Sequence, residues 1–228
     1  MALENLDNIF IVIPAYNEDQ RIGFVISELH ELGFNNIVVV NDASTDQTAS
    51  VSQGYFNTKV LNHLINLGPG GATQTGIQYS LNCGAEYIAT IDADYQHDPK
   101  DILTLIDKIQ TKNLDIVIGS RFMKENEIPK IRVFYNKFGN VINYMLTGKM
   151  MSDSQSGLKI IRSSLARKLS LKTNGFEFCI ELIRNAHSVK AKIEEVPISV
   201  KYSKETMEKG QSLASGFSML GRLFTPFN

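Results

Sequence analysis

The chain has 228 residues, of which 43% are apolar, enough to bury the core of one large domain. Its formal net charge of −1 gives no electrostatic reason to expect a nucleic-acid partner. Its two cysteines, Cys83 and Cys179, lack CxxC spacing, which indicates neither a disulfide framework nor a zinc site and fits a reducing cytosol.

Residues 1–8 lack the basic and apolar stretches of a signal peptide. No apolar run approaches the roughly 20 residues that span a bilayer. We therefore expect a cytoplasmic protein, either soluble or peripheral on the cytoplasmic face of a membrane.

Apolar strands and amphipathic helices alternate along the first half of the chain. The run Ile37 to Val40 is β-branched throughout, which is typical of a parallel strand buried on both faces. Strands are predicted at 8–13, 37–40, 60–61, 87–91 and 114–118, and helices at 19–32, 70–81 and 99–109. This alternation predicts βαβ units, and hence an α/β fold with a mainly parallel central sheet flanked by helices.

The second half is less regular, and we treat residues 1–228 as a single domain. A helix is predicted at 131–146, a strand at 158–161, a helix at 177–186, and a strand at 193–202 that Pro197 places at a sheet edge. Residues 204–228 form a charged loop followed by apolar residues at helical spacing. That last segment predicts an amphipathic C-terminal helix, which lies on a membrane or packs against the domain or a second subunit.

Asp92 and Asp94 follow the strand predicted at 87–91. Because side chains alternate along a strand, these carboxylates are expected to emerge on the same side. Two carboxylates that close repel each other unless a cation lies between them, and oxygen ligands suit Mg²⁺ or Mn²⁺. The pair therefore predicts a metal–diphosphate site at the end of a strand. The alternative is an acidic turn, with Asp98 and Pro99 starting the next helix.

Three further polar segments follow predicted strands, at 13–18, 41–48 and 66–76. Asp42 in the second segment could accept a hydrogen bond from a nucleobase, or it could be a turn or N-cap residue. Gly70 and Gly71 in the third segment would permit close contact with a phosphate or sugar at a helix N-terminus. Parallel strands would bring these segments to one edge of the sheet.

The ordered motifs IPAYNE, NDASTDQT, NLGPGGATQTG, DADYQHDP and IGSRF cover nearly all of residues 9–122. Together they resemble the family 2 glycosyltransferases, which have the GT-A nucleotide-sugar fold. SDSQSGLK, GFEFCIEL and EVPISVKY, later in the chain, resemble the polyprenyl-phosphate hexosyltransferase branch, which includes the dolichyl-phosphate mannose and glucose synthases. The resemblance implies a nucleotide-sugar-binding half at 9–122 and an acceptor-binding half at 123–203.

The resemblance also implies roles for individual residues. Those implied to bind the nucleotide or sugar are Pro14, Tyr16, Glu18, Asp42, Gly70, Gly71, Asp92 and Gln155. Mg²⁺ or Mn²⁺ would be held by Asp92, Asp94 and Gln96. Those implied to be catalytic are Asp94, Arg121, Arg132 and Asp153, with the two arginines facing the acceptor phosphate or the donor diphosphate.

One departure from the family pattern leaves the donor sugar open. Mannose synthases usually have Thr-Ser-Gly-Phe-Arg where this chain has Gln155 to Lys159, which favours the glucose-type or the bacterial and archaeal relatives.

Three functions are therefore considered. The first is metal-dependent, inverting transfer of a hexose from a UDP- or GDP-sugar to a polyprenyl (dolichyl or undecaprenyl) phosphate at the membrane surface. The second is glycosylation of a saccharide chain in envelope polysaccharide synthesis, where an alcohol acceptor would need Asp153 as a base. The third is a non-catalytic nucleotide-sugar binding protein, which the two carboxylates disfavour. A homodimer or a membrane partner protein is the macromolecular partner considered.

Overall fold

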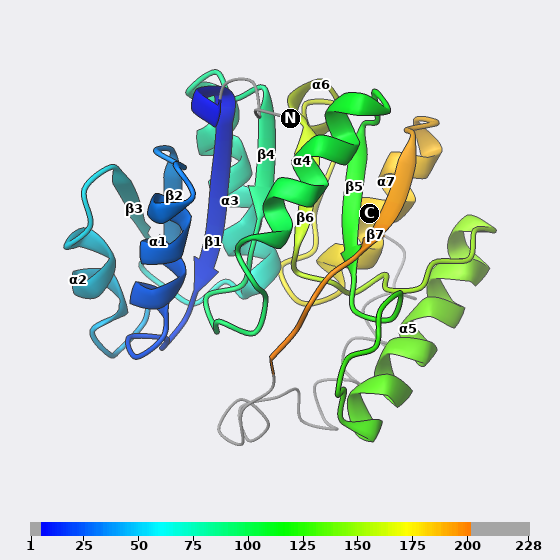
Figure 1. Cartoon of the computed structure of the whole chain (residues 1–228), viewed down its shortest axis with the longest axis horizontal. Helices are drawn as coiled ribbons and strands as arrows, with labels where there is room; N and C mark the ends of the chain where they lie inside the picture. Colours follow the sequence, from blue (N-terminus) through cyan, green and yellow to red (C-terminus); the bar gives the residue numbers. More distant parts are fainter. Residues whose placement is uncertain (1–5, 202–228) are drawn as a thin grey trace.

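A single seven-stranded sheet forms the centre of the protein (Figure 1). The computed structural model describes residues 6–201, apart from the side chains of four residues in one helix, at 130, 132, 135 and 146. The strands are β1 (Ile9–Ala15), β2 (Ile37–Asn41), β3 (Thr58–Asn62), β4 (Tyr87–Thr90), β5 (Ile116–Ser120), β6 (Lys159–Arg162) and β7 (Ile193–Pro197). Their order across the sheet is β3-β2-β1-β4-β6-β5-β7.

The central strands are buried on both faces, as their apolar sequences require. Every residue of β2, β4 and β5 is buried, whereas β3 at one edge is only partly covered. The predicted strand at 193–202 is β7, and the prediction that it lies at an edge is confirmed.

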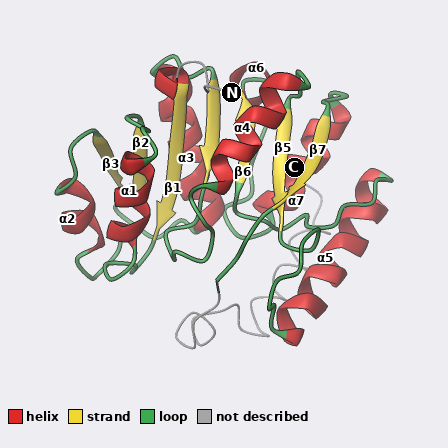
Figure 2. Cartoon of the chain, viewed as in Figure 1, coloured by secondary structure: helices red, strands yellow, loops and turns green. Residues whose placement is uncertain are grey.

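Helices cover both faces of the sheet and divide the core in two (Figure 2). On one face lie α1 (Ile22–Glu31) and α4 (Asp101–Thr111), with their apolar residues in one buried cluster. On the other face lie α3 (Pro69–Asn82), α7 (Phe178–Ser188) and the short α6 (Ser163–Ala166). The α/β fold predicted from the sequence is therefore confirmed.

The remaining helices lie at the margins of the sheet. A 3-10 turn, η1 (Leu6–Asn8), precedes β1, and α2 (Thr48–Gln53) lies beside β3. The longest helix, α5 (Lys130–Thr147), contacts α7 and lies at the end of the molecule toward which β1 points.

The sheet is not parallel throughout, because β6 runs antiparallel to both of its neighbours, β4 and β5. The remaining pairs are parallel: β1 with β2 and β4, β2 with β3, and β5 with β7. A short apolar run such as 158–161 carries no signal for strand direction, so this reversal was not predicted.

Two features of the first half also differ from the sequence prediction. Strand β1 continues to Ala15, so the loop predicted from Pro14 begins two residues later. Helix α2 was not predicted, because its polar sequence TASVSQ has no apolar periodicity.

The predicted charged loop at 204–210 and amphipathic helix at 212–227 lie outside the described residues. Within residues 6–201, none of the helices is long and apolar enough to cross a membrane.

Candidate active site

The polar segments predicted to meet do so at the carboxyl ends of β1, β2, β4 and β5. Backbone amides of the loop after β1 bind side chains that follow β2: Asn17 N–H donates to Ser44 Oγ in the loop at 3.0 Å, and Glu18 N–H to Thr48 Oγ1 at the start of α2 at 2.8 Å. The Glu18 charge in turn contributes to the raised pKa of Asp94, which follows β4. This edge of the sheet is therefore one continuous polar site.

Asp92 and Asp94 lie in the turn that follows β4. The Asp92 side chain is 46% exposed, and its Oδ2 lies 3.5 Å from Nε2 of the buried His97. Asp94 accepts two hydrogen bonds from Gln96, one from its backbone N–H at 3.0 Å and one from Nε2 at 2.5 Å. Residues of the same turn thus contact both carboxylates, and the half-exposed Asp92 carboxylate stays accessible to a ligand.

The two carboxylates have pKa values displaced in opposite directions. Burial and the neighbouring Asp92 charge raise the pKa of Asp94 to about 6. The loss of solvent around Asp92 raises its pKa. The hydrogen bond and charge of His97, together with the charges of Lys159 and Arg121, outweigh this effect and lower the pKa overall. One member of the pair thus carries a negative charge that a cation would stabilise.

The donor set fits a hard divalent cation. Two of the three candidate ligands, Asp92 and Asp94, are carboxylates, and the third, Gln96, has an amide oxygen. The repulsion between the two carboxylates is the physical condition that a bound Mg²⁺ or Mn²⁺ would relieve. No cluster of three or more His, Cys, Asp or Glu side chains suited to a metal occurs within residues 6–201.

Gly157 lies directly against the Asp92 carboxylate. A Cβ atom at position 157 would overlap all three atoms of the carboxyl group, so any other residue there would displace the Asp92 carboxylate. Thr90 Oγ1 donates to Gly157 O at 2.7 Å and ties the end of β4 to this segment. Lys159, which is 2% exposed, donates from Nζ to Ser156 O at 2.6 Å.

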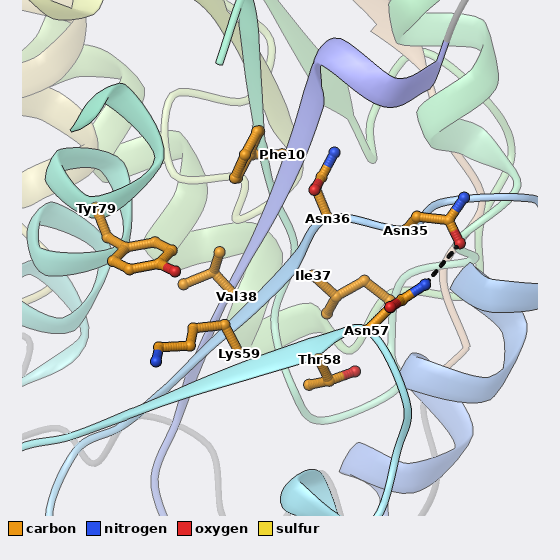
Figure 3. Close-up of a pocket in the computed structure, with 9 residues that line it drawn as sticks. All are labelled: Phe10, Asn35, Asn36, Ile37, Val38, Asn57, Thr58, Lys59 and Tyr79. Atoms are coloured by element: carbon orange, nitrogen blue, oxygen red, sulfur yellow. Dashed lines mark hydrogen bonds between the residues drawn. The ribbon is translucent and has the colours of Figure 1, made fainter. Parts of the chain in front are cut away.

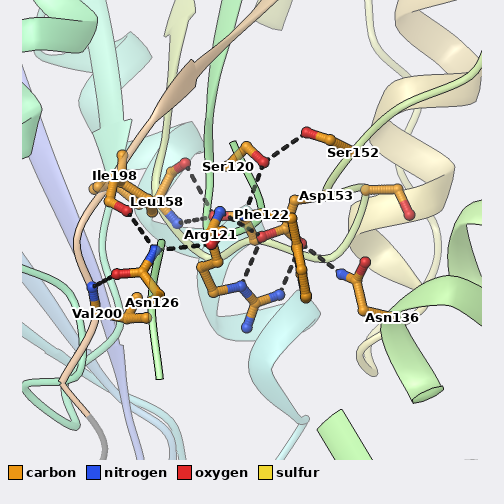
Figure 4. A network of polar contacts seen from close by, with 12 residues as sticks. Ser120, Arg121, Phe122, Asn126, Asn136, Ser152, Asp153, Leu158, Ile198 and Val200 are labelled. Atoms are coloured by element: carbon orange, nitrogen blue, oxygen red, sulfur yellow. Dashed lines mark hydrogen bonds and ion pairs between the residues drawn. The ribbon is translucent and has the colours of Figure 1, made fainter. Parts of the chain in front are cut away.

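Arg121 is held by a fully buried carboxylate (Figure 4). Its Nε donates to Asp153 Oδ2 at 2.6 Å and its Nη2 to Asp153 Oδ1 at 2.8 Å, while its backbone N–H donates to the same Oδ2. The Arg121 side chain is 15% exposed and that of Asp153 is 0% exposed. This bidentate geometry fixes the guanidinium plane near Asp92.

Three elements hold Asp153 in turn. Asn136 of α5 donates from Nδ2 to Asp153 Oδ1 at 2.6 Å. Glu195 of β7 accepts from the backbone N–H groups of Ser152 and Asp153 at 2.9 Å. Ser120 Oγ, at the end of β5, lies 2.6 Å from Ser152 Oγ. The arginine thus depends on a network that spans β5, α5 and β7.

Asp42 is 2% exposed and its carboxylate already accepts three hydrogen bonds. The donors are Leu67 N–H at 2.9 Å, Gly68 N–H at 2.8 Å and His63 Nδ1 at 2.7 Å. Asp42 therefore positions the glycine-rich segment, and its predicted contact with a nucleobase stays a prediction.

Gly70 and Gly71 lie against the backbone of residues 173–175. Their N–H groups donate to Asn174 O at 2.8 and 3.1 Å, and a Cβ on Gly70 would lie 2.7 Å from the carbonyl oxygens of Thr173 and Gly175. The need for glycine here is explained by the packing of α3 on residues 173–178, and a contact with phosphate or sugar stays a prediction.

The structure places the other predicted residues as follows. Pro14 lies within β1, Tyr16 is 48% exposed, and Glu18 forms an ion pair with Arg21 at 3.2 Å. The Gln155 side chain packs on Gly139 of α5. Arg132 belongs to α5, but its side chain lies outside the described ones.

Several residues of the site were not singled out from the sequence: Gly157, Lys159, Asn136 and Glu195. Gly157 and Lys159 lie in the motif SDSQSGLK and Glu195 in EVPISVKY, whereas Asn136 lies in none of the motifs quoted above. His97, which lies close to the two carboxylates in the sequence, contacts Asp92.

A separate cavity of about 260 Å³ lies at the opposite ends of β2 and β3 (Figure 3). Its lining includes Phe10, Asn35, Asn57, Lys59 and Tyr79, and Asn57 Nδ2 donates to Asn35 Oδ1 at 3.3 Å. None of the predicted site residues lines it.

The sequence matches the family described as Glycosyl transferase family 2 over residues 10–170. It is 34% identical to the UDP-N-acetylglucosamine–dolichyl-phosphate N-acetylglucosaminyltransferase of Methanococcus voltae, over 94% of each chain. It is 37% identical to an uncharacterised protein of Methanocaldococcus jannaschii, over 96% of this chain and 92% of that one.

Among solved structures, the fold is similar to that of the glucosyl-3-phosphoglycerate synthase of Mycobacterium tuberculosis in complex with Mn²⁺, UDP and glucosyl-3-phosphoglycerate. The TM-score is 0.75 and the identity 15%, over 98% of this chain and 83% of that one. A structure of the same synthase with phosphoglyceric acid gives a TM-score of 0.76 at 17% identity.

Proposed function

Because the chain belongs to glycosyl transferase family 2 and has the GT-A fold of that family, we propose that it transfers a hexose from a UDP- or GDP-sugar to a polyprenyl phosphate. The observation that carries this proposal is the position of Asp92 and Asp94 after β4 and of Arg121, held by Asp153, after the parallel strand β5, at one edge of the sheet. The Methanococcus voltae relative supports it, since its name assigns a dolichyl phosphate as acceptor.

On the donor side, Asp92 and Asp94 would hold the metal, with Gln96 beside them donating two hydrogen bonds to Asp94. A bound Mg²⁺ or Mn²⁺ supplies charge neutralisation on the nucleoside-diphosphate leaving group. The loops after β1 and β2 hold the nucleotide, and the exposed Tyr16 ring lies on the first of them.

On the acceptor side, Arg121 orients a phosphate through paired N–H donors. A phosphate monoester is already ionised near neutral pH, so its oxygen attacks without a general base. Attack on the face opposite the leaving group inverts the anomeric centre. The contacts of Asp153 fit this chemistry, because its carboxylate is 0% exposed and bidentate to Arg121, which positions the arginine.

The test is incubation of the purified chain with radiolabelled UDP- or GDP-sugars and a detergent-dispersed polyprenyl phosphate, followed by lipid extraction. We expect label in the lipid phase only when Mg²⁺ or Mn²⁺ is present. Label in a saccharide polymer would assign the second function considered above, and the absence of label in any product would leave a nucleotide-sugar binding protein.

A further inference from the structure

The turn after β4 contains a strained residue between two of the candidate metal ligands. Tyr95 has φ 58°, in the left-handed region that residues with a bulky side chain rarely adopt. It lies between Asp94 and Gln96, so its backbone conformation sets the direction in which the chain carries Gln96 past the Asp94 carboxylate. Strain of this kind persists only where the surrounding structure holds the residue in place.

Helix α1 holds the Tyr95 side chain on one side. The Tyr95 hydroxyl donates to the Glu28 carboxylate, and this hydrogen bond, together with burial, raises the pKa of Tyr95 to about 12. The Tyr95 ring centroid lies 5.8 Å from that of Phe24, which is one helical turn before Glu28. The opposite side of α1 is packed in the core, where its apolar residues are 0% exposed, so the helix is a firm support for the turn.

The segment that follows β7 holds the turn on another side. Lys201 Nζ lies 5.6 Å from the Tyr95 ring centroid, and Lys201 N–H donates to Gln96 O at 2.9 Å. His97 and Val200 form an antiparallel bridge beside this contact. Two segments that are far from the turn in the sequence thus contact Tyr95 or its neighbours, which explains how the turn keeps a strained residue.

We propose that Tyr95 is a positioning residue, whose hydrogen bond to Glu28 holds the turn in the conformation that binds the divalent cation. Asp92 is held independently of Tyr95, by its contacts with His97 and Gly157. Release of Tyr95 toward negative φ would therefore move Asp94 relative to Asp92, and a cation shared by the two carboxylates would be bound less tightly. This role rests on the proposed function, since it requires that the turn holds Mg²⁺ or Mn²⁺.

The test is Mn²⁺ binding to the full chain at pH 8, with free Mn²⁺ counted by electron paramagnetic resonance. Tyr95→Phe removes only the hydroxyl and Glu28→Ala only its acceptor. We expect each to weaken Mn²⁺ binding by about tenfold, the size expected for one hydrogen bond to a charged group. The double variant should bind Mn²⁺ as weakly as either single variant, because both changes remove the same hydrogen bond. Glu28→Gln keeps an oxygen acceptor and should restore most of the affinity.

Tyr55→Phe is the matched control. Tyr55 also packs on α1, with its ring centroid 6.2 Å from that of His30, but it belongs to the connection between α2 and β3. This variant should bind Mn²⁺ as wild type does. Thermal unfolding of each variant separates positioning from support of the fold, because a purely structural role would lower the melting temperature and leave Mn²⁺ affinity unchanged.

Three results would overturn the proposal: wild-type protein that binds no Mn²⁺, Tyr95→Phe with wild-type Mn²⁺ affinity, or losses that add in the double variant. Transfer to detergent-dispersed polyprenyl phosphate is measured separately, so the two proposals can fail separately. Wild-type transfer with unchanged Mn²⁺ affinity in Tyr95→Phe rejects the positioning role alone. The expected loss of Mn²⁺ affinity, in a protein whose wild type transfers no sugar to that lipid, rejects the proposed function alone.

Discussion

At the scale of single residues, Asp94 is the carboxylate whose ionisation a bound cation would favour most, because its pKa is raised to about 6. We expect Asp94→Asn to keep the fold but to lower the transfer rate by about a thousandfold, since metal stabilisation of a transition state is typically worth several kcal/mol. Scintillation counting of extracted lipid measures the rate, and circular dichroism checks the fold. Full activity of wild type in excess chelator would remove the metal from the mechanism.

The pKa of Asp94 also predicts how pH affects metal binding. Its value of about 6 in the folded protein lies above the ordinary 3.8, so the proton on Asp94 stabilises the metal-free fold at low pH. That contribution is complete below pH 3.8 and is lost as the pH rises through about 6. A cation must displace this proton, so Mn²⁺ affinity should fall by up to about tenfold per pH unit below 6.

Calorimetry in buffers of different ionisation enthalpy would report this proton release. We expect close to one proton released per Mn²⁺ near pH 5 and almost none at pH 8. Equal Mn²⁺ affinity at both pH values would mean that Asp94 is ionised throughout this range.

The Arg121–Asp153 pair should be costly to break. Asp153→Asn leaves the guanidinium without its charged partner in a largely buried position, so we expect a loss of about 3–5 kcal/mol in the free energy of unfolding. Urea denaturation measures the loss. In Arg121→Gln/Asp153→Asn neither charge remains, so the double variant should be more stable than Asp153→Asn; additive losses would show that the two side chains do not depend on each other.

At the scale of elements, the segment that leads into β6 forms one wall of the proposed metal site. We expect Gly157→Ala to reduce metal-dependent activity severely, because the new methyl group would displace the Asp92 carboxylate. Gly54→Ala is the matched control: Gly54 ends α2 with φ −69°, and a Cβ there would lie 3.3 Å from the nearest atom, Val51 O. Wild-type Mn²⁺ affinity in Gly157→Ala would show that this wall can move.

The elements also show where prediction from the sequence succeeds. Strands such as 37–40, helices such as 19–32 and the polar edge of the sheet were predicted, because apolar periodicity and strand-end position are local signals. The direction of β6 and the contacts of Asp153 with Asn136 and Glu195 were not predicted, because they join segments that lie more than 15 residues apart in the chain. Only tertiary structure distinguishes Asp153 as a partner of Arg121 from Asp153 as a base.

At the scale of the whole molecule, the predicted nucleotide-sugar-binding half (9–122) and acceptor-binding half (123–203) share one sheet. Strand β5, at 116–120, pairs only with β6 and β7, which both come from residues after 158. A fragment ending at residue 122 would therefore leave β5 without a partner and β4 with an exposed edge. We expect that fragment to be insoluble on expression, whereas one ending at residue 201 should be soluble; a soluble, cooperatively melting fragment 1–122 would contradict this.

The reversed strand also determines the order in which the nascent chain can fold. On the ribosome, β1 to β4 can pair as they emerge, but β5 must wait until some 40 further residues have been made. Helix α5 is synthesised during that interval, with its apolar side chains and before its hydrogen-bonding partners in residues 152–154. Asp92 and Asp94 precede in the chain the glycine that packs against the Asp92 carboxylate, so the proposed metal site is completed only when β6 inserts between its neighbours.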